Sequence, residues 1–337
     1  MFTELHQVEG LAEMELGCMM MARSETPDHV ATAERLGYDF VLVADSPAFM
    51  ADPWMTLARA ADRTTRIRLG PAAITPRMRH VVANAGAAAL LSQIAPGRSE
   101  VVVGSGFTSQ AMIGKKPVPW SEVEEYIVAL RSLLAGEETA WDGSVTALTY
   151  GPLVGITLPV DLPILVAAHG PKGYAVAERV GDGIVTNPMH GNSNELERHR
   201  RIVVQVNGTV LEDDESFDDP RVFATAGPAA AMQLHLGEGG AARGTLELAA
   251  FTAALEEIDA SRRHLQVHRS HFIAVTDFER EFVTPDLIRR CTDTGTRDQW
   301  RTRISGFDAQ GVTGVMLAPA GTDITRELAA FAECVKR

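Results

Sequence analysis

The sequence predicts an α/β fold, and within that class a (β/α)8 barrel that carries insertions. Short apolar runs and helical segments alternate four times before Gly136, and such alternation is typical of a parallel sheet. A strand–helix–strand unit at residues 163–187 continues the pattern, and a strand–helix pair ends the chain. The 337 residues leave room for insertions, because a barrel of this kind typically takes about 250 residues.

Each strand is predicted from a short, unbroken apolar run, the pattern of a strand buried on both faces of a parallel sheet. The predicted strands are residues 15–21, 40–44, 67–74, 100–103, 164–168, 184–186 and 314–318. The predicted helices are residues 27–36, 53–61, 81–93, 121–134, 174–180, 297–309 and 323–335. The helix at 121–134 carries Ser121 and Glu124 at the spacing of a capping box.

Two stretches, residues 137–162 and 188–283, interrupt this rhythm, and we expect both to be insertions into a single domain of residues 1–337. In the first, Trp141–Ser144 (WDGS) is typical of a hairpin turn. In the second, we expect helices near 228–236 and 246–261, and a strand just after His271.

Composition and charge exclude several classes of function. The net charge of −13 and the pI near 5.2 argue against nucleic acid or an anionic membrane as the main partner. No apolar run reaches the ~20 residues that span a bilayer, and acidic residues such as Glu4 and Glu9 interrupt the amino terminus, unlike a signal peptide. The three widely spaced cysteines form neither a disulfide framework nor a metal-ligand spacing. We therefore expect a cytoplasmic protein.

The turn at residues 169–172 (HGPK) combines two features of an anion site. It lies at the carboxyl end of the predicted strand 164–168 and at the start of the helix that follows. Backbone N–H groups and the positive end of the helix dipole meet there, so the turn can hold a phosphate. Pro171 suits a first helical position, which needs no N–H. An ordinary strand-to-helix turn can have the same sequence features. Both a phosphate site and an ordinary turn therefore stay open.

A series of short motifs, in a fixed order along the chain, gives a family resemblance. They are Ala33–Asp39, Ala44–Pro47, Asp52–Trp54, Arg66–Pro71, Ala95–Arg98, Gly104–Gly106, Ala167–Lys172 and Gly181–Gly183. With these motifs the chain resembles the luciferase-like monooxygenase superfamily. The likeness is closer to its branch of deazaflavin-dependent reductases, typified by methylenetetrahydromethanopterin reductase.

The resemblance implies a luciferase-like TIM barrel with a flavin-type cofactor at the carboxyl ends of the strands, where barrels of this class place their sites. Coenzyme F420 is the preferred cofactor and FMN the alternative. The resemblance also implies a bulge with a non-prolyl cis peptide after the third strand, supporting the cofactor ring. By position this would be the Ala72–Ala73 bond.

The resemblance also assigns roles to individual residues. Asp45 and Ser46 would be the catalytic pair, at the ring and the substrate mouth. The cofactor would be held by Ala72, Ala73, Ser105, Gly106, Thr108, Ala168, Gly170, Pro171, Lys172, Thr186 and Asn187. More weakly, Met19, His80, Phe107 and His271 would line the substrate pocket. For His80, a helix-entry hydrogen bond is the competing interpretation, and for Lys172 it is a solvated side chain.

Two departures from related chemistries bear on the reaction. Bacterial luciferase has a catalytic histidine near the end of the second strand, where this chain reads Asp45-Ser46-Pro47. The sugar-phosphate dehydrogenase branch has a histidine and a glutamate where this chain has Ser46 and Phe107. Hydride transfer to or from a small organic substrate is therefore favoured, with the cofactor carrying the reaction.

Two alternatives stay open. One is an FMN-dependent two-component monooxygenase, which would need a flavin or F420 reductase as partner to supply reduced cofactor. The other is a non-catalytic barrel homologue. The resemblance also leads us to expect a homodimer.

Three histidines, His264, His268 and His271, raise the question of a metal site. If residues 264–271 were helical, these side chains would share one face, but no partner carboxylate completes a known ligand spacing. The sequence therefore predicts no metal, and instead partly buried, hydrogen-bonded histidines.

Overall fold

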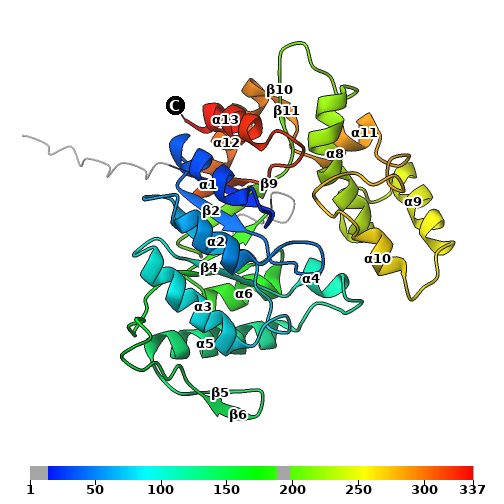
Figure 1. The fold of residues 1–337 in the computed structure, drawn as a ribbon. Helices are drawn as coiled ribbons and strands as arrows, with labels where there is room; N and C mark the ends of the chain where they lie inside the picture. Colours follow the sequence, from blue (N-terminus) through cyan, green and yellow to red (C-terminus); the bar gives the residue numbers. More distant parts are fainter. Residues whose placement is uncertain (1–13, 188–197, 337) are drawn as a thin grey trace, which may run out of the picture.

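Eight parallel strands form the centre of the computed structural model, which describes residues 14–187 and 198–336 (Figure 1). In spatial order they are β3 (Arg68–Pro71), β2 (Phe40–Val43), β1 (Glu15–Met20), β12 (Gly314–Leu317), β9 (Ile202–Val206), β8 (Gly183–Thr186), β7 (Ile164–Ala167) and β4 (Val101–Gly104). Two isolated parallel bridges, Leu69–Ser99 and Ile74–Val103, join the outer strands. The sheet therefore closes on itself, and the predicted (β/α)8 barrel is confirmed.

Helices surround this ring (Figure 1). The helices packed around the barrel are α1 (Thr26–Arg35), α2 (Pro53–Ala61), α3 (Val81–Ile94), α5 (Trp120–Ala135), α6 (Pro171–Val180), α12 (Arg297–Ala309) and α13 (Ile324–Val335). Their buried faces and the outward faces of the strands form the main hydrophobic core. Among the described residues, none of the helices has both the length and the apolar character that a membrane span requires.

The barrel interior is filled from its amino end. Four charged side chains form a ring of ion pairs there: Arg68 and Arg201 each bind Glu15, at 2.7 and 2.8 Å, and Arg201 binds the buried Glu100 at 2.6 Å. Both guanidinium groups stack on the ring of Phe40, 5.6 and 5.1 Å from its centroid. Apolar side chains occupy the layer above. Any site inside the ring must therefore open at the carboxyl ends of the strands.

The first predicted insertion contains the hairpin expected from its sequence. Strand β5 (Thr139–Trp141) pairs antiparallel with β6 (Ser144–Thr146). The two turn residues, Asp142 and Gly143, have φ values of 50° and 75°, as a type I′ turn requires. The predicted turn is confirmed.

The second insertion was predicted at residues 188–283, but in the structure the inserted chain begins later along the sequence. Residues 188–197 lie outside the described part, and Ile202–Val206 is the barrel strand β9 rather than inserted chain. The extra segment runs from residue 207 to 294, and we call it the helical insertion. It contains β10 (Val210–Leu211), α8 (Pro220–His235), the short η1 (Gly237–Gly239), α9 (Leu246–Glu256), α10 (Arg263–Val267) and α11 (Pro285–Cys291), and β10 pairs with β11 (Gly295–Thr296).

Three other local expectations, two in the helical insertion and one at the start of α5, were wrong. The helix expected to start at Pro228 begins at Pro220 and carries Pro228 inside it. No strand begins directly after His271. Ser270 and Phe272 adopt left-handed φ values of 55° and 61°, which lie outside the β region. The capping box is also absent: Pro119 is the N-cap of α5 without a side-chain hydrogen bond. Glu124 instead binds Arg179 at 2.6 Å.

The helical insertion has its own apolar core and also packs on the barrel. Helices α8 to α11 gather on one side of the barrel, away from the β5–β6 hairpin (Figure 1). A smaller cluster joins the two parts, in which Ala229 and Phe272 contact Met21, Ala44 and Ala318, residues that follow β1, β2 and β12. The insertion thus borders the carboxyl ends of these strands.

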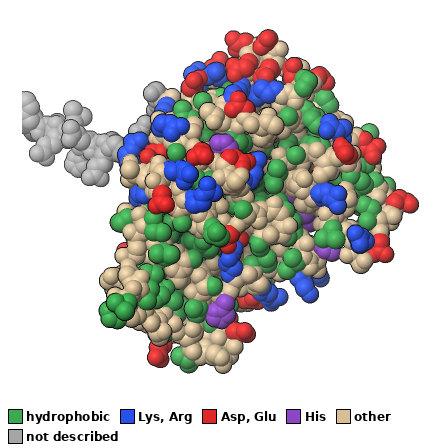
Figure 2. All heavy atoms as spheres, viewed as in Figure 1, with side chains coloured by type: hydrophobic (Ala, Val, Ile, Leu, Met, Phe, Trp, Pro, Cys, Tyr) green, Lys and Arg blue, Asp and Glu red, His purple; other side chains and the backbone are tan. Residues whose placement is uncertain are grey.

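The surface carries charges of both signs. Acidic and basic side chains intermix over the face shown in Figure 2, and acidic side chains gather at its top, above the loop between β10 and α8. This face offers no extended basic patch, in line with the net charge.

Candidate active site

Asp45 and Ser46 follow β2 at the carboxyl end of the barrel, and both are buried. Oδ2 of Asp45 lies 3.5 Å from Nε of Arg79, while Oδ1 has no hydrogen-bond partner in the described part of the chain. Burial raises the pKa of Asp45, and the positive charge of Arg79 offsets this only in part. The barrel mouth therefore holds a carboxyl group that keeps its proton more readily than an ordinary aspartate.

A cis peptide bond joins Ala72 and Ala73, directly after β3. The bulge predicted at this bond is therefore present. The N–H of Ala72 donates to the carbonyl of Val43 at 2.8 Å, which ties the bulge to the strand that precedes Asp45. A side chain on Gly104 would come within 3.0 Å of Cβ of Ala73. The bulge therefore lies between the ends of β2 and β4.

The loop after β4 is built around Gly106. Its φ is 76°, and a Cβ at this position would approach Cγ2 of Thr75 to 2.5 Å, so only glycine fits there. The predicted contacts Ser105 and Thr108 are half-buried on either side, and Phe107 is exposed at the start of α4 (Phe107–Ala111). The loop thus offers main-chain groups and small side chains at the barrel mouth.

The turn predicted to bind phosphate leads into α6, which begins at Pro171, three residues earlier than expected. Lys172 is exposed, in agreement with the competing interpretation. A Cβ on Gly170 would meet no atom within 4 Å, so packing does not require this glycine. The tightly packed one is Gly173, where a Cβ would lie 2.7 Å from the ring of Trp120. Sequence reasoning did not single out Gly173.

The remaining predicted phosphate contacts differ in accessibility. Ala168 and Thr186 are completely buried, and the hydroxyl of Thr186 pairs with that of Tyr174 at 3.1 Å. Asn187 is half-buried, and its Oδ1 has no partner within the described residues. Asn187 is therefore the side chain among these three with a polar atom still available, and the phosphate role of all three stays a prediction.

The four residues assigned to the substrate pocket are dispersed. Met19 is half-buried among the apolar side chains of the barrel interior. Phe107 is exposed in the segment that follows β4. His80 is the N-cap of α3, where its Nδ1 accepts a hydrogen bond from the N–H of Val82, so the helix-entry interpretation is confirmed. His271 is buried, with its ring edge-on to Phe49 at 6.1 Å.

Gln110 is a polar residue that sequence reasoning missed. It lies on α4, its side chain is buried, and its Nε2 has no partner in the part of the chain that the structure describes. The stretch after Gly106 carries no motif and was interpreted as loop, so no signal in the sequence pointed to this side chain.

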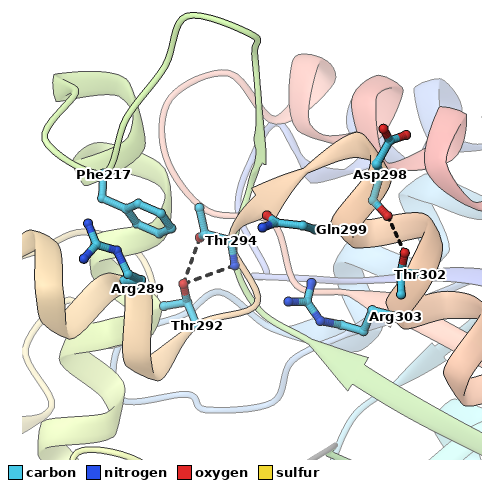
Figure 3. Close-up of a pocket in the computed structure, with 8 residues that line it drawn as sticks. All are labelled: Phe217, Arg289, Thr292, Thr294, Asp298, Gln299, Thr302 and Arg303. Atoms are coloured by element: carbon cyan, nitrogen blue, oxygen red, sulfur yellow. Dashed lines mark hydrogen bonds between the residues drawn. The ribbon is translucent and has the colours of Figure 1, made fainter.

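A separate hollow of about 740 Å³ lies between α11 and the start of α12 (Figure 3). Arg289 stacks on Phe217, 5.0 Å from its centroid, and Thr292 donates a hydrogen bond to Thr294 at 2.8 Å. No lining residue belongs to a barrel strand or to the predicted site. Because this hollow contains none of the predicted site residues, the candidate active site remains the barrel mouth.

Comparison with known proteins agrees with this architecture. Residues 2–314 match the family model described as luciferase-like monooxygenase. The 5,10-methylenetetrahydromethanopterin reductase of Methanolobus tindarius is 30% identical over 168 residues, 49% of this chain and 50% of that protein. The F420-dependent glucose-6-phosphate dehydrogenase of Beutenbergia cavernae is 33% identical over 182 residues, 48% of this chain and 52% of that protein. The chain thus spans about half the length of these curated relatives.

A solved structure shows the same fold along nearly the whole chain. The coenzyme F420-dependent tetrahydromethanopterin reductase of Methanopyrus kandleri superposes with a TM-score of 0.71, covering 96% of this chain and 98% of that one at 17% sequence identity.

Proposed function

Because the chain belongs to the luciferase-like monooxygenase family, we propose that it is an oxidoreductase that binds coenzyme F420 at the barrel mouth and acts on a small organic substrate. Asp45 and Ser46 are the catalytic pair of this proposal. FMN is the alternative cofactor, and with it the protein would be a two-component monooxygenase that depends on a partner reductase. A homodimer belongs to the proposal as well.

One observation carries the proposal: Asp45 is a buried carboxyl group at the end of a barrel strand, and one of its oxygens has no partner among the described residues. An unpaired buried oxygen is costly unless a ligand or water supplies a partner. Burial raises the pKa of Asp45, and a raised pKa makes its carboxylate a stronger proton acceptor. Asp45 is therefore well suited to exchange a proton with a substrate at the mouth.

The surrounding residues fit a flat, polar cofactor. The loop after β4 turns at Gly106, where the main chain packs closely against Thr75. The Ala72–Ala73 bulge would support the ring, and Ser105 with Thr108 would border it. Residues 170–172 would hold the tail, together with Oδ1 of Asn187, which has no partner within the described ranges 14–187 and 198–336. When bound, a deazaflavin supplies or accepts the hydride.

The choice of deazaflavin over FMN rests on two points. Two relatives in the comparison carry F420-dependent names. In addition, Ser46 stands where luciferase chemistry requires a histidine.

The test is an anaerobic titration of the full chain with reduced F420 and, separately, with reduced FMN, followed by fluorescence. Gly170→Phe is the informative variant, because a Cβ at this position would meet no described atom within 4 Å and the added ring would extend from the turn proposed to bind phosphate. Gly151→Phe is its matched control, since it also has free space around it. We expect tight F420 binding that Gly170→Phe weakens at least tenfold and Gly151→Phe leaves unchanged. FMN binding in the titration, followed by oxygen uptake once air is admitted, would replace the reductase by the monooxygenase. Binding of neither cofactor would leave the non-catalytic homologue.

A further inference from the structure

The helical insertion brings together three histidines, one of which is His271. His235 is the last residue of α8, and His268 and His271 follow α10. One ring nitrogen of each lies within 4.8 Å of the others. The side chain of His235 is 1% exposed, and His268 and His271 are also buried. The cluster is therefore shielded from solvent.

Glu279 determines which nitrogen of His235 carries the proton. One carboxylate oxygen of Glu279 accepts hydrogen bonds from the N–H and the hydroxyl of Thr276, each at 2.7 Å. The other lies 2.5 Å from Nε2 of His235. Since the carboxylate accepts at both oxygens, Nε2 of His235 is the donor. In neutral His235 the lone pair is then on Nδ1, which faces Nδ1 of His271 at 2.8 Å.

The other two histidines also present nitrogen atoms suited to a ligand. Nδ1 of His268 is buried and has no hydrogen-bond partner within the described residues. Nδ1 of His271 faces Nδ1 of His235. A ring nitrogen without its proton is the form of imidazole that binds metal ions.

We propose that His235, His268 and His271 bind a divalent transition-metal ion of the zinc class. Three imidazoles are a common ligand set for zinc, with a fourth position for another ligand. A histidine whose second nitrogen donates to a carboxylate, as His235 does to Glu279, is the usual outer support of such a site. Tetrahedral Zn–N bonds of about 2.0–2.1 Å separate the nitrogens by roughly 3.3 Å. That value falls between the 2.8 Å contact and the 4.8 Å limit of the cluster, so small side-chain rotations close the site.

The ion would join the end of α8 to the turn after α10. The ring of His271 packs edge-on against Phe49, in the turn that follows Asp45 and Ser46. The metal would therefore hold the helical insertion against this turn. This inference does not depend on the proposed cofactor or reaction.

The test is a Co²⁺ titration of the full chain after EDTA treatment, because tetrahedral Co²⁺ shows visible absorption where Zn²⁺ is silent. We expect one equivalent to bind, Zn²⁺ to displace it, and the melting temperature to rise with added Zn²⁺. His268→Gln and His271→Gln should abolish the absorption, and Glu279→Gln should weaken binding about 10- to 100-fold. His264→Gln is the matched control, because His264 lies in the same segment outside the cluster.

The opposite results are equally clear. Circular dichroism first establishes that each variant is folded. Absence of stoichiometric Co²⁺ and Zn²⁺ binding by the unaltered chain would overturn the proposal and leave a hydrogen-bonded chain from Glu279 through His235 to His271. Binding that survives both histidine variants, or that His264→Gln removes, would place the ion elsewhere and would overturn it too.

Discussion

The guanidinium of Arg79 lies 3.5 Å from the carboxylate of Asp45, too far for a strong hydrogen bond. Arg79 binds Asp52 more closely, at 2.8 Å, and Asp52 in turn accepts a hydrogen bond from Met55 at the start of α2. Arg79 therefore pairs mainly with Asp52, the N-cap of α2. Its positive charge offsets only part of the cost of burying a charge on Asp45. This arrangement explains why the pKa of Asp45 is raised.

Asp45→Asn should reduce turnover by about 10²- to 10⁴-fold, the usual contribution of a positioned proton donor or acceptor. Asp62→Asn, at an exposed position just after α2, should leave it unchanged. Steady-state kinetics with the identified substrate checks both variants. A fully active Asp45→Asn would remove Asp45 from the mechanism.

The same carboxyl should influence stability in a defined direction. Because the pKa of Asp45 is raised above its ordinary value of 3.8, the native state holds this proton to higher pH than the unfolded chain does. The contribution of Asp45 to the free energy of unfolding therefore decreases as pH rises from about 3.8, the ordinary pKa of the carboxyl group, through its raised pKa in the folded protein. Urea unfolding at pH 4 and pH 7 should show that Asp45→Asn gains stability relative to the unaltered protein at the higher pH. An equal difference at both values would contradict this.

Arg79→Met should raise the pKa of Asp45 further, because Arg79 supplies the favourable charge. The limb of the pH–rate profile that Asp45 governs should then move to higher pH. Arg77→Met is the control, since Arg77 pairs with Glu122 at the surface, 2.6 Å away. Coincident profiles for the two variants would mean that Asp45 does not titrate in the observed limb.

Gly106→Ala should destabilise the fold by more than Gly97→Ala. Both glycines have positive φ, 76° and 69°, and a side chain at either costs roughly 1 kcal/mol for its left-handed backbone. Only at Gly106 does the new Cβ also clash with Thr75, at 2.5 Å, which adds about 1–3 kcal/mol. Chemical denaturation measures the difference, and equal costs would show that Thr75 moves aside freely.

Glu100→Gln should cost about 3–5 kcal/mol of unfolding free energy, because it removes a buried carboxylate and leaves two half-buried guanidinium groups at the base of the barrel without their full counter-charge. Glu100 binds Arg201 at 2.6 Å and lies 3.5 Å from Arg68. Glu122→Gln, which breaks the surface pair with Arg77, should have no measurable effect. A similarly small effect for Glu100→Gln would mean that Glu15 alone can balance both arginines.

Local patterns were sufficient where one segment contains its whole signal. The run Phe40–Val43 is apolar at every position and became a strand buried throughout. The Asp142-Gly143 pair formed the expected turn because its residues tolerate positive φ.

Local patterns failed where a partner from another segment competes. Glu124, expected to cap its own helix, is drawn to Arg179 on α6. Ile202–Val206 is a barrel strand because β8 and β12 flank it, and neither neighbour is visible in its own sequence.

The sequence by itself determined the barrel and the placement of Asp45 at a strand end, because apolar periodicity and the residues that interrupt it are local properties. Only the tertiary structure decided what surrounds Asp45, and it alone brought His235 within 2.8 Å of His271, 36 residues later. Such contacts follow from how α8 packs against the turn after α10. No spacing along the chain specifies that packing, because it depends on all the apolar surfaces that the helical insertion buries together.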